Sequence, residues 1–206
     1  MPVVWHDTVS SAEPSVTPGG FAAARSLLRR NRDFRRLYLA SVISLGGDWF
    51  LLVALFGLAL ELSPSPFAVA FIVAAQDLTY FLASPVTGAL ADRVDRRILM
   101  VVADVARAIL VVGFLLVRSP DTLWIAYALL AVFATFSAAF EPASAAALPN
   151  LVEKEDLGIA NALSGSLWGT MLAVGAAIGG IVTAALGRDV AIAIDALSFV
   201  ASASLI

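Results

Sequence analysis

Long apolar runs separated by short polar breaks dominate this sequence. They cover residues 37–60, 67–91, 98–117, 122–148, 159–186 and 190–206. A helix needs about 20 apolar residues to cross the hydrocarbon core of a bilayer, and lipid forces each segment to satisfy its own backbone hydrogen bonds. The pattern therefore predicts an all-α membrane protein with six transmembrane helices in one domain over residues 37–206.

The composition argues against several other classes of protein. Of the 206 residues, 60% are hydrophobic and only 14% are charged, whereas soluble domains are about a quarter charged. There is no cysteine, and the one histidine, His6, lies in a polar tail, which disfavours metal sites and histidine-based catalysis. No phosphate-binding G-x-x-x-x-G-K-[ST] loop occurs either. We therefore expect no enzyme, no ATP-driven pump, no metal, no cofactor and no nucleic-acid partner.

Basic residues flank the runs asymmetrically. Ten lie before the first run, between the second and third, or between the fourth and fifth, whereas the opposite loops hold only Arg118 and Arg188. Loops rich in Lys and Arg stay in the cytoplasm. The asymmetry predicts a multi-pass protein of the inner or plasma membrane with a cytoplasmic N-terminus.

The chain before the first run divides into two parts. Residues 1–20 are rich in Pro, Ser, Thr and Gly, and this composition predicts a disordered tail. Residues 21–36 mix apolar side chains with six arginines. This basic segment has two interpretations: a short helix lying on the anionic membrane surface, or charges that only set the topology.

The segment from Gly88 to Arg97 reads G-A-L-A-D-R-V-D-R-R and lies between the second and third runs. It resembles the G-x-L-a-D-R-x-G-R-R/K signature of the major facilitator superfamily. Asp95 replaces a glycine of the general signature, which is similar to the branch of the enterobactin exporter, the transmembrane secretion effectors. The resemblance implies a cytoplasmic gating signature, in which Asp92 and Arg93 lock that side during alternating access. Its residues are Gly88, Asp92, Arg93, Asp95, Arg96 and Arg97.

Members of this superfamily have twelve helices in two six-helix halves. The resemblance implies that the chain is the N-terminal half of a proton-coupled exporter of a small amphipathic molecule, such as a drug or siderophore. Its partners would be the proton, the substrate, the lipid bilayer, and either the missing C-terminal half or a second copy. Nutrient uptake, a half-size transporter acting as a dimer, and a non-transporting scaffold or regulator remain as alternatives.

Polar side chains inside the spans are candidates for function, because charge inside a membrane is costly and needs a reason. The candidate proton or substrate site comprises Asp48, Gln76, Asp77 and Glu141. The other interpretation is that these side chains hold neighbouring helices together.

Two further charges in the spans have a structural interpretation. Asp104 and Arg107 are three residues apart, so they share one helix face. We expect a local charge pair, or contact with the cluster around Asp92. Asp195 in the last run is also interpreted as structural.

Glycines are regularly spaced in the fifth run. Gly165 with Gly169, and Gly175 with Gly179, form G-x-x-x-G patterns, which let membrane helices pack closely. With Gly180, the second pair resembles the G-P-x-x-G-G motif of drug antiporters, although an alanine replaces the proline. These glycines either pack within this half or contact the missing half.

Overall fold

The computed structural model describes residues 18–63 and 65–206, and these residues form helices and no strand. This part of the chain confirms the all-α class. Most of the tail expected over residues 1–20 lies outside the described residues.

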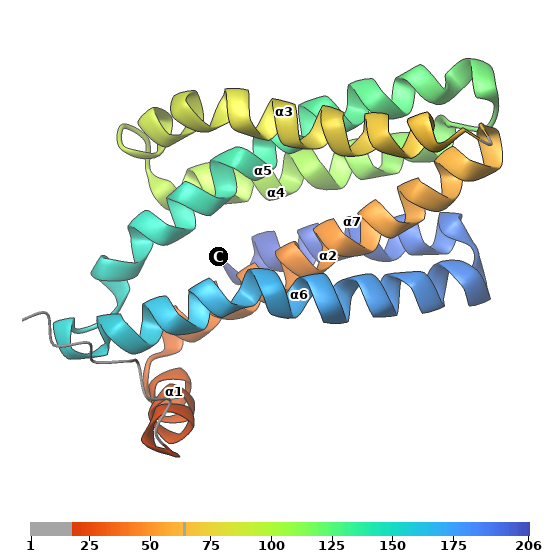
Figure 1. Ribbon diagram of the computed structural model, residues 1–206. Helices are drawn as coiled ribbons and strands as arrows, with labels where there is room; N and C mark the ends of the chain where they lie inside the picture. Colours follow the sequence, from red (N-terminus) through yellow and green to blue (C-terminus); the bar gives the residue numbers. More distant parts are fainter. Residues whose placement is uncertain (1–17, 64) are drawn as a thin grey trace, which may run out of the picture.

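Within the described residues, seven α-helices and three short 3-10 helices follow one another. Helices α2 to α7 run side by side, and α1 lies across one end of the bundle (Figure 1). The elements are α1 Pro18–Arg30, α2 Arg32–Leu62, α3 Pro66–Ala91, α4 Arg96–Gly113, η1 Phe114–Leu116, η2 Pro120–Thr122, α5 Leu123–Leu151, η3 Lys154–Asp156, α6 Leu157–Leu186 and α7 Arg188–Leu205.

Several helices extend past the apolar runs that predict them, although α4 ends at Gly113, before the end of its run. Helix α2 begins at Arg32, because the Asn31 side chain accepts a hydrogen bond from the Phe34 N–H and caps the helix. Helix α5 continues through Pro149 to Leu151. Apolar length marks the part of a helix that suits lipid, whereas caps decide where the helix itself begins and ends.

Five of the described helices are long and apolar enough to cross a membrane, namely α2, α3, α4 with η1, α5 with η2, and α6 with η3. Helix α7 is not among them; it has 18 residues and carries Arg188, Asp189 and Asp195. It nevertheless packs against α2 and α4. The membrane-protein class is thus supported, while the expected sixth span differs from the other five in its three charged residues.

The helix packing has an internal symmetry. Helix α2 packs against α6 and α7, α5 packs against α3 and α4, and α4 packs against α7. If α2 is swapped with α5, α3 with α6 and α4 with α7, the same five pairs result. Two structural repeats of three helices have this property.

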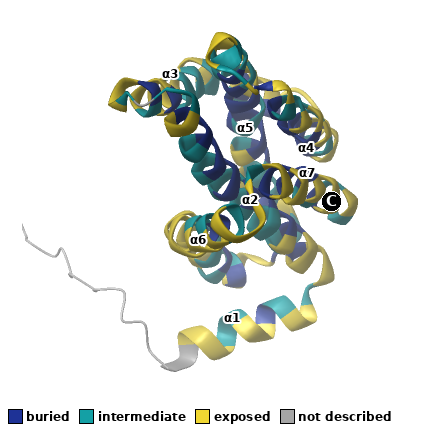
Figure 2. Ribbon diagram, turned by 90° about the vertical axis from the view of Figure 1, so that its right-hand side faces the viewer, coloured by how far each residue is buried: buried dark blue, intermediate teal, exposed yellow. Residues whose placement is uncertain are grey.

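Helices α3 and α6 occupy equivalent places in the two repeats and are the least covered. In the most apolar stretch of each of these helices only 11% is buried, against 44% for α2, α4 and α5. Both are largely exposed in the end-on view (Figure 2). These two helices therefore leave large apolar surfaces uncovered, while α2, α4 and α5 contribute the interior that positions the polar groups below.

Candidate functional site

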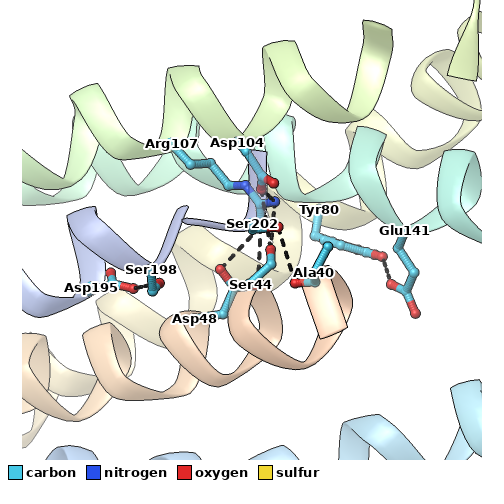
Figure 3. A network of polar contacts seen from close by, with 10 residues as sticks. All are labelled: Ala40, Ser44, Asp48, Tyr80, Asp104, Arg107, Glu141, Asp195, Ser198 and Ser202. Atoms are coloured by element: carbon cyan, nitrogen blue, oxygen red, sulfur yellow. Dashed lines mark hydrogen bonds and ion pairs between the residues drawn. The ribbon is translucent and has the colours of Figure 1, made fainter. Parts of the chain in front are cut away.

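One arginine lies fully inside the described bundle, surrounded by acidic and hydroxyl groups (Figure 3). Arg107 of α4 is 1% exposed. Its Nη1 lies 3.4 Å from Oδ1 of Asp48 on α2. Its Nη2 donates to Ser44 Oγ at 2.8 Å and to the Asp104 carboxylate. We call Ser44, Asp48, Asp104 and Arg107 the Arg107 network; it joins α2 to α4.

Two aromatic rings enclose the guanidinium of Arg107. Its Cζ atom lies 4.9 Å from the ring centroid of Phe140 on α5 and 4.5 Å from that of Phe199 on α7. A cation over an aromatic face is attracted by the ring quadrupole, more strongly where water is excluded. Arg107 thus contacts four helices and holds one buried positive charge at their centre.

The two carboxylates of the network differ in their access to the outside. Asp104 is 0% exposed, whereas the Asp48 side chain is 17% exposed. Asp104 and Arg107 form the expected pair, but Arg107 also turns to Asp48, and not to the cluster around Asp92. No spacing rule links Asp48 to Arg107 across 59 positions; the only signal was that an arginine inside a span requires counter-charges on neighbouring helices.

Asp195 is buried on α7 behind a glycine of α2. Its side chain accepts a hydrogen bond from Ser198 Oγ at 3.3 Å. A Cβ atom at Gly47 would lie 2.3 Å from Asp195 Oδ1. Only glycine therefore allows the two helices to approach this closely, a role that the sequence did not reveal.

A second polar group lies beside the network and is more exposed. The hydroxyl of Tyr80 on α3 donates to the carboxylate of Glu141 on α5. Gln76 lies one turn before Tyr80 and is partly exposed, and Asp77 is exposed. We call Tyr80 and Glu141, together with Gln76 and Asp77 of the same stretch of α3, the Tyr80 cluster. Asp48 and Glu141 lie close enough for their charges to interact, and the structure adds Tyr80, which was not among the predicted site residues.

Pro142 of α5 leaves a backbone carbonyl without its helical donor, and another helix supplies a replacement. Proline lacks an N–H, so the carbonyl four residues earlier loses its partner. That carbonyl belongs to Ala138, and it accepts a hydrogen bond of 2.7 Å from Thr87 Oγ1 on α3. In the interior of a membrane protein such a replacement is needed, and it attaches α3 to α5.

The signature segment forms the turn between α3 and α4. Asp95 caps α4, accepting from the N–H groups of Arg97 and Ile98 at 2.9 and 3.1 Å. The aspartate that departs from the general signature therefore has a local structural reason. Arg96 donates to the Ala146 carbonyl of α5 at 2.6 Å.

Three other signature residues make no such contact. Asp92 and Arg93 are exposed. Nothing in the described chain lies within 4 Å of a Cβ atom placed at Gly88. This turn of α3 therefore packs against no other described helix at Gly88, and the gating role of the signature stays a prediction.

The glycines of α6 divide into two groups. A Cβ atom at Gly175 would lie 3.0 Å from the Gly46 carbonyl oxygen of α2, and one at Gly179 would lie 2.9 Å from Phe50 Cα. These two glycines, with Gly180 beside them, pack within this half. Gly165 and Gly169 have nothing within 4 Å among the described residues. Packing within this half therefore holds for Gly175 and Gly179, whereas contact of Gly165 and Gly169 with the missing half stays a prediction.

The basic segment is attached to the end of the bundle. Leu27 of α1 is 1% exposed. Arg30 pairs with Asp156 of η3, and the Asn31 side chain donates to the Leu151 carbonyl at 2.6 Å. Helix α1 is therefore folded onto the link between α5 and α6, and contact with lipid stays a prediction.

Comparison with known proteins gives a consistent result. A family described as transmembrane secretion effector matches residues 24–206. The chain is 30% identical over 183 residues to the uncharacterized MFS-type transporter YfiS of Bacillus subtilis, a match that covers 88% of this chain and 43% of that protein. A match to YvqJ of the same organism, also an uncharacterized MFS-type transporter, is 25% identical and covers 64% of this chain and 32% of that protein. No solved structure matches the chain.

The chain thus spans less than half the length of the curated relatives it matches. The match over residues 24–206 confirms the resemblance first noted in the segment from Gly88 to Arg97. The chain belongs to the transmembrane secretion effector family of MFS-type transporters.

Proposed function

We propose that this chain is the N-terminal six-helix half of a twelve-helix secondary transporter that exports a small amphipathic molecule in exchange for protons. Membership of the family makes it a transporter rather than an enzyme. The repeated packing of α2–α4 and α5–α7 supports the half-transporter architecture. The excess of arginines at the α1 end supports a cytoplasmic N-terminus in the cell membrane.

The observation that carries proton coupling is the Arg107 network. Asp48 is its partly accessible carboxyl, and it faces a cation that Asp104 already neutralises. Deprotonated Asp48 is held to Arg107, whereas protonated Asp48 loses most of that attraction. Binding a proton therefore weakens one tie between α2 and α4, and a change of this kind shifts the balance between two helix arrangements.

The Tyr80 cluster supports contact with the substrate. The Glu141 carboxylate and the Tyr80 hydroxyl lie beside the Arg107 network, and Glu141 is exposed. Trp49 and Trp168 meet edge to face with ring centroids 5.5 Å apart, and Trp168 is 57% exposed. Exposed polar groups and an exposed aromatic ring in the same bundle suit a molecule with both apolar and polar parts.

The other wall of the substrate path belongs to the C-terminal half or to a second copy. Gly165 and Gly169 provide a small-residue face on α6 for that wall. At the arginine-rich end, Asp92 and Arg93 are exposed and free to form the cytoplasmic lock with it.

The test is transport by the protein reconstituted in lipid vesicles, with the amphipathic dye ethidium as the probe. We expect an imposed pH gradient to drive the dye across the membrane, and a proton ionophore to abolish the effect. Movement of the dye at the same rate with and without the gradient would contradict proton exchange. Transport by residues 1–206 alone would favour the second copy over the C-terminal half.

A further inference from the structure

Asp195 is a buried carboxyl that the Arg107 network does not include. It is 1% exposed. One oxygen accepts from Ser198, and the other, Oδ2, has no hydrogen-bond partner among the described residues. Gly47 leaves the space into which the carboxyl fits. The side chain is therefore enclosed between α2 and α7 (Figure 3).

The charges around this carboxyl do not balance. Asp48 on α2 and Arg107 on α4 are the charged groups that interact electrostatically with Asp195. Asp104 lies beside Arg107. Helix α6 also packs on α7, but it has no ionisable side chain from Leu157 to Leu186. Three carboxyls thus share one guanidinium.

That guanidinium is already engaged. The Nη atoms of Arg107 contact Asp48, Ser44 and Asp104. An ionised Asp195 would be an additional buried charge without its own cation, which is far more costly than a buried neutral carboxyl. If Asp195 is neutral, the interior has one negative charge fewer to balance.

We propose that Asp195 is a second proton-binding site of this transporter, and that it holds its proton while α2 and α7 are packed as they are here. The inference rests on the proposed proton-coupled function and deepens it. Separation of α7 from Gly47 would admit water to the carboxyl, which then releases H⁺ and becomes a carboxylate. With Asp48 as the first site, two protons move in each cycle.

Infrared spectroscopy of the protein in lipid bilayers at neutral pH tests the site without any transport. A protonated carboxyl in apolar surroundings has a carbonyl stretching band distinct from that of a carboxylate. We expect this band in the wild type, its loss in Asp195→Asn, and its retention in Asp104→Asn. A wild type without the band, or an Asp195→Asn variant that keeps every such band, would overturn the proposal.

A second variant covers the case in which Asp195→Asn does not fold. Ser198→Ala keeps the carboxyl and removes its one hydrogen-bond donor, so the band should persist and move to higher frequency. An unmoved band would assign it to another residue and overturn the proposal.

Proton counting then separates this inference from the proposed function. We expect Asp195→Asn to move the dye with about half as many protons per molecule as the wild type. An unchanged ratio would overturn the second proton while leaving coupling intact. A wild type that has the band but moves no protons would instead refute the proposed coupling.

Discussion

The Arg107 network and the Tyr80 cluster contain similar side chains but differ in enclosure. In the network, Asp104 is 0% exposed and Arg107 1%. In the cluster, Asp77 and Glu141 are exposed. A buried charge is costly without its partner, whereas an exposed ion pair contributes little. The network must therefore support both the fold and the proton site, while the cluster is free to change with the substrate.

Removal of the buried cation should have the largest effect. Arg107→Ala leaves Asp104 and Asp48 without a counter-charge, and we expect a loss of about 3–5 kcal/mol in unfolding free energy. Denaturation of the purified protein in detergent measures it. The matched control is Arg118→Ala, which breaks an exposed pair with Asp189 and should cost about 0–1 kcal/mol. Equal losses in the two variants would remove the distinction between buried and exposed charge.

Glycine packing between α2 and α6 allows a comparison within one helix. Gly179→Ala places a Cβ atom 2.9 Å from Phe50 Cα, and such overpacking costs about 1–3 kcal/mol. Gly169→Ala enters open space and should be neutral or slightly stabilising in the same denaturation experiment. A Gly169→Ala variant of residues 1–206 as unstable as Gly179→Ala would contradict this arrangement of α6.

The hydrogen bond from Thr87 to the Ala138 carbonyl should be worth about 1–3 kcal/mol, because Thr87→Val leaves a buried carbonyl unsatisfied. Pro142→Ala restores the backbone N–H that the proline lacks. We therefore expect the Thr87→Val substitution to cost less in the Pro142→Ala background. A double-mutant cycle with no coupling between the two positions would show that Thr87 does not replace the missing helical donor.

The cap at Asp95 should have the smallest effect. Asp95→Ala removes the acceptor for two backbone N–H groups of α4 and should cost about 0.5–2 kcal/mol, whereas Asp95→Gly, the residue of the general signature, should cost only about a few tenths. Thermal melts of the two variants check this order. Identical melting of Asp95→Ala and the wild type would argue that the capping bonds do not stabilise α4.

The sequence predicted the helices well because apolar length and polar breaks are local properties. It placed Asp48 and the pair of Asp104 and Arg107 among the polar groups of interest, but in separate sites. Their union depends on how far α2 and α4 are shifted along each other, which no spacing in one helix determines. The fit of Asp195 behind Gly47 was hidden for the same reason, since a glycine alone does not say which side chain it admits.

Two other features of the structure are marked by a single residue in the sequence. A proline within an apolar run, such as Pro142, marks a carbonyl without its helical donor, but the replacement donor, Thr87, lies 51 positions before that carbonyl. Asp95 was noted as a departure from the general signature, and its capping role could have been read from the sequence, because aspartate is favoured immediately before a helix.

The central claim is that the Arg107 network couples protons while the Tyr80 cluster contacts substrate. Asp48→Asn and Glu141→Gln test it in vesicles, where ethidium movement driven by a pH gradient is compared with ethidium exchange without a gradient. The account predicts that Asp48→Asn strongly lowers the driven movement, because only the proton of Asp195 remains, and that it keeps the exchange. Glu141→Gln should keep the coupling and change the dye concentration that gives half-maximal transport. Gradient-driven movement by Asp48→Asn at the wild-type rate would contradict it.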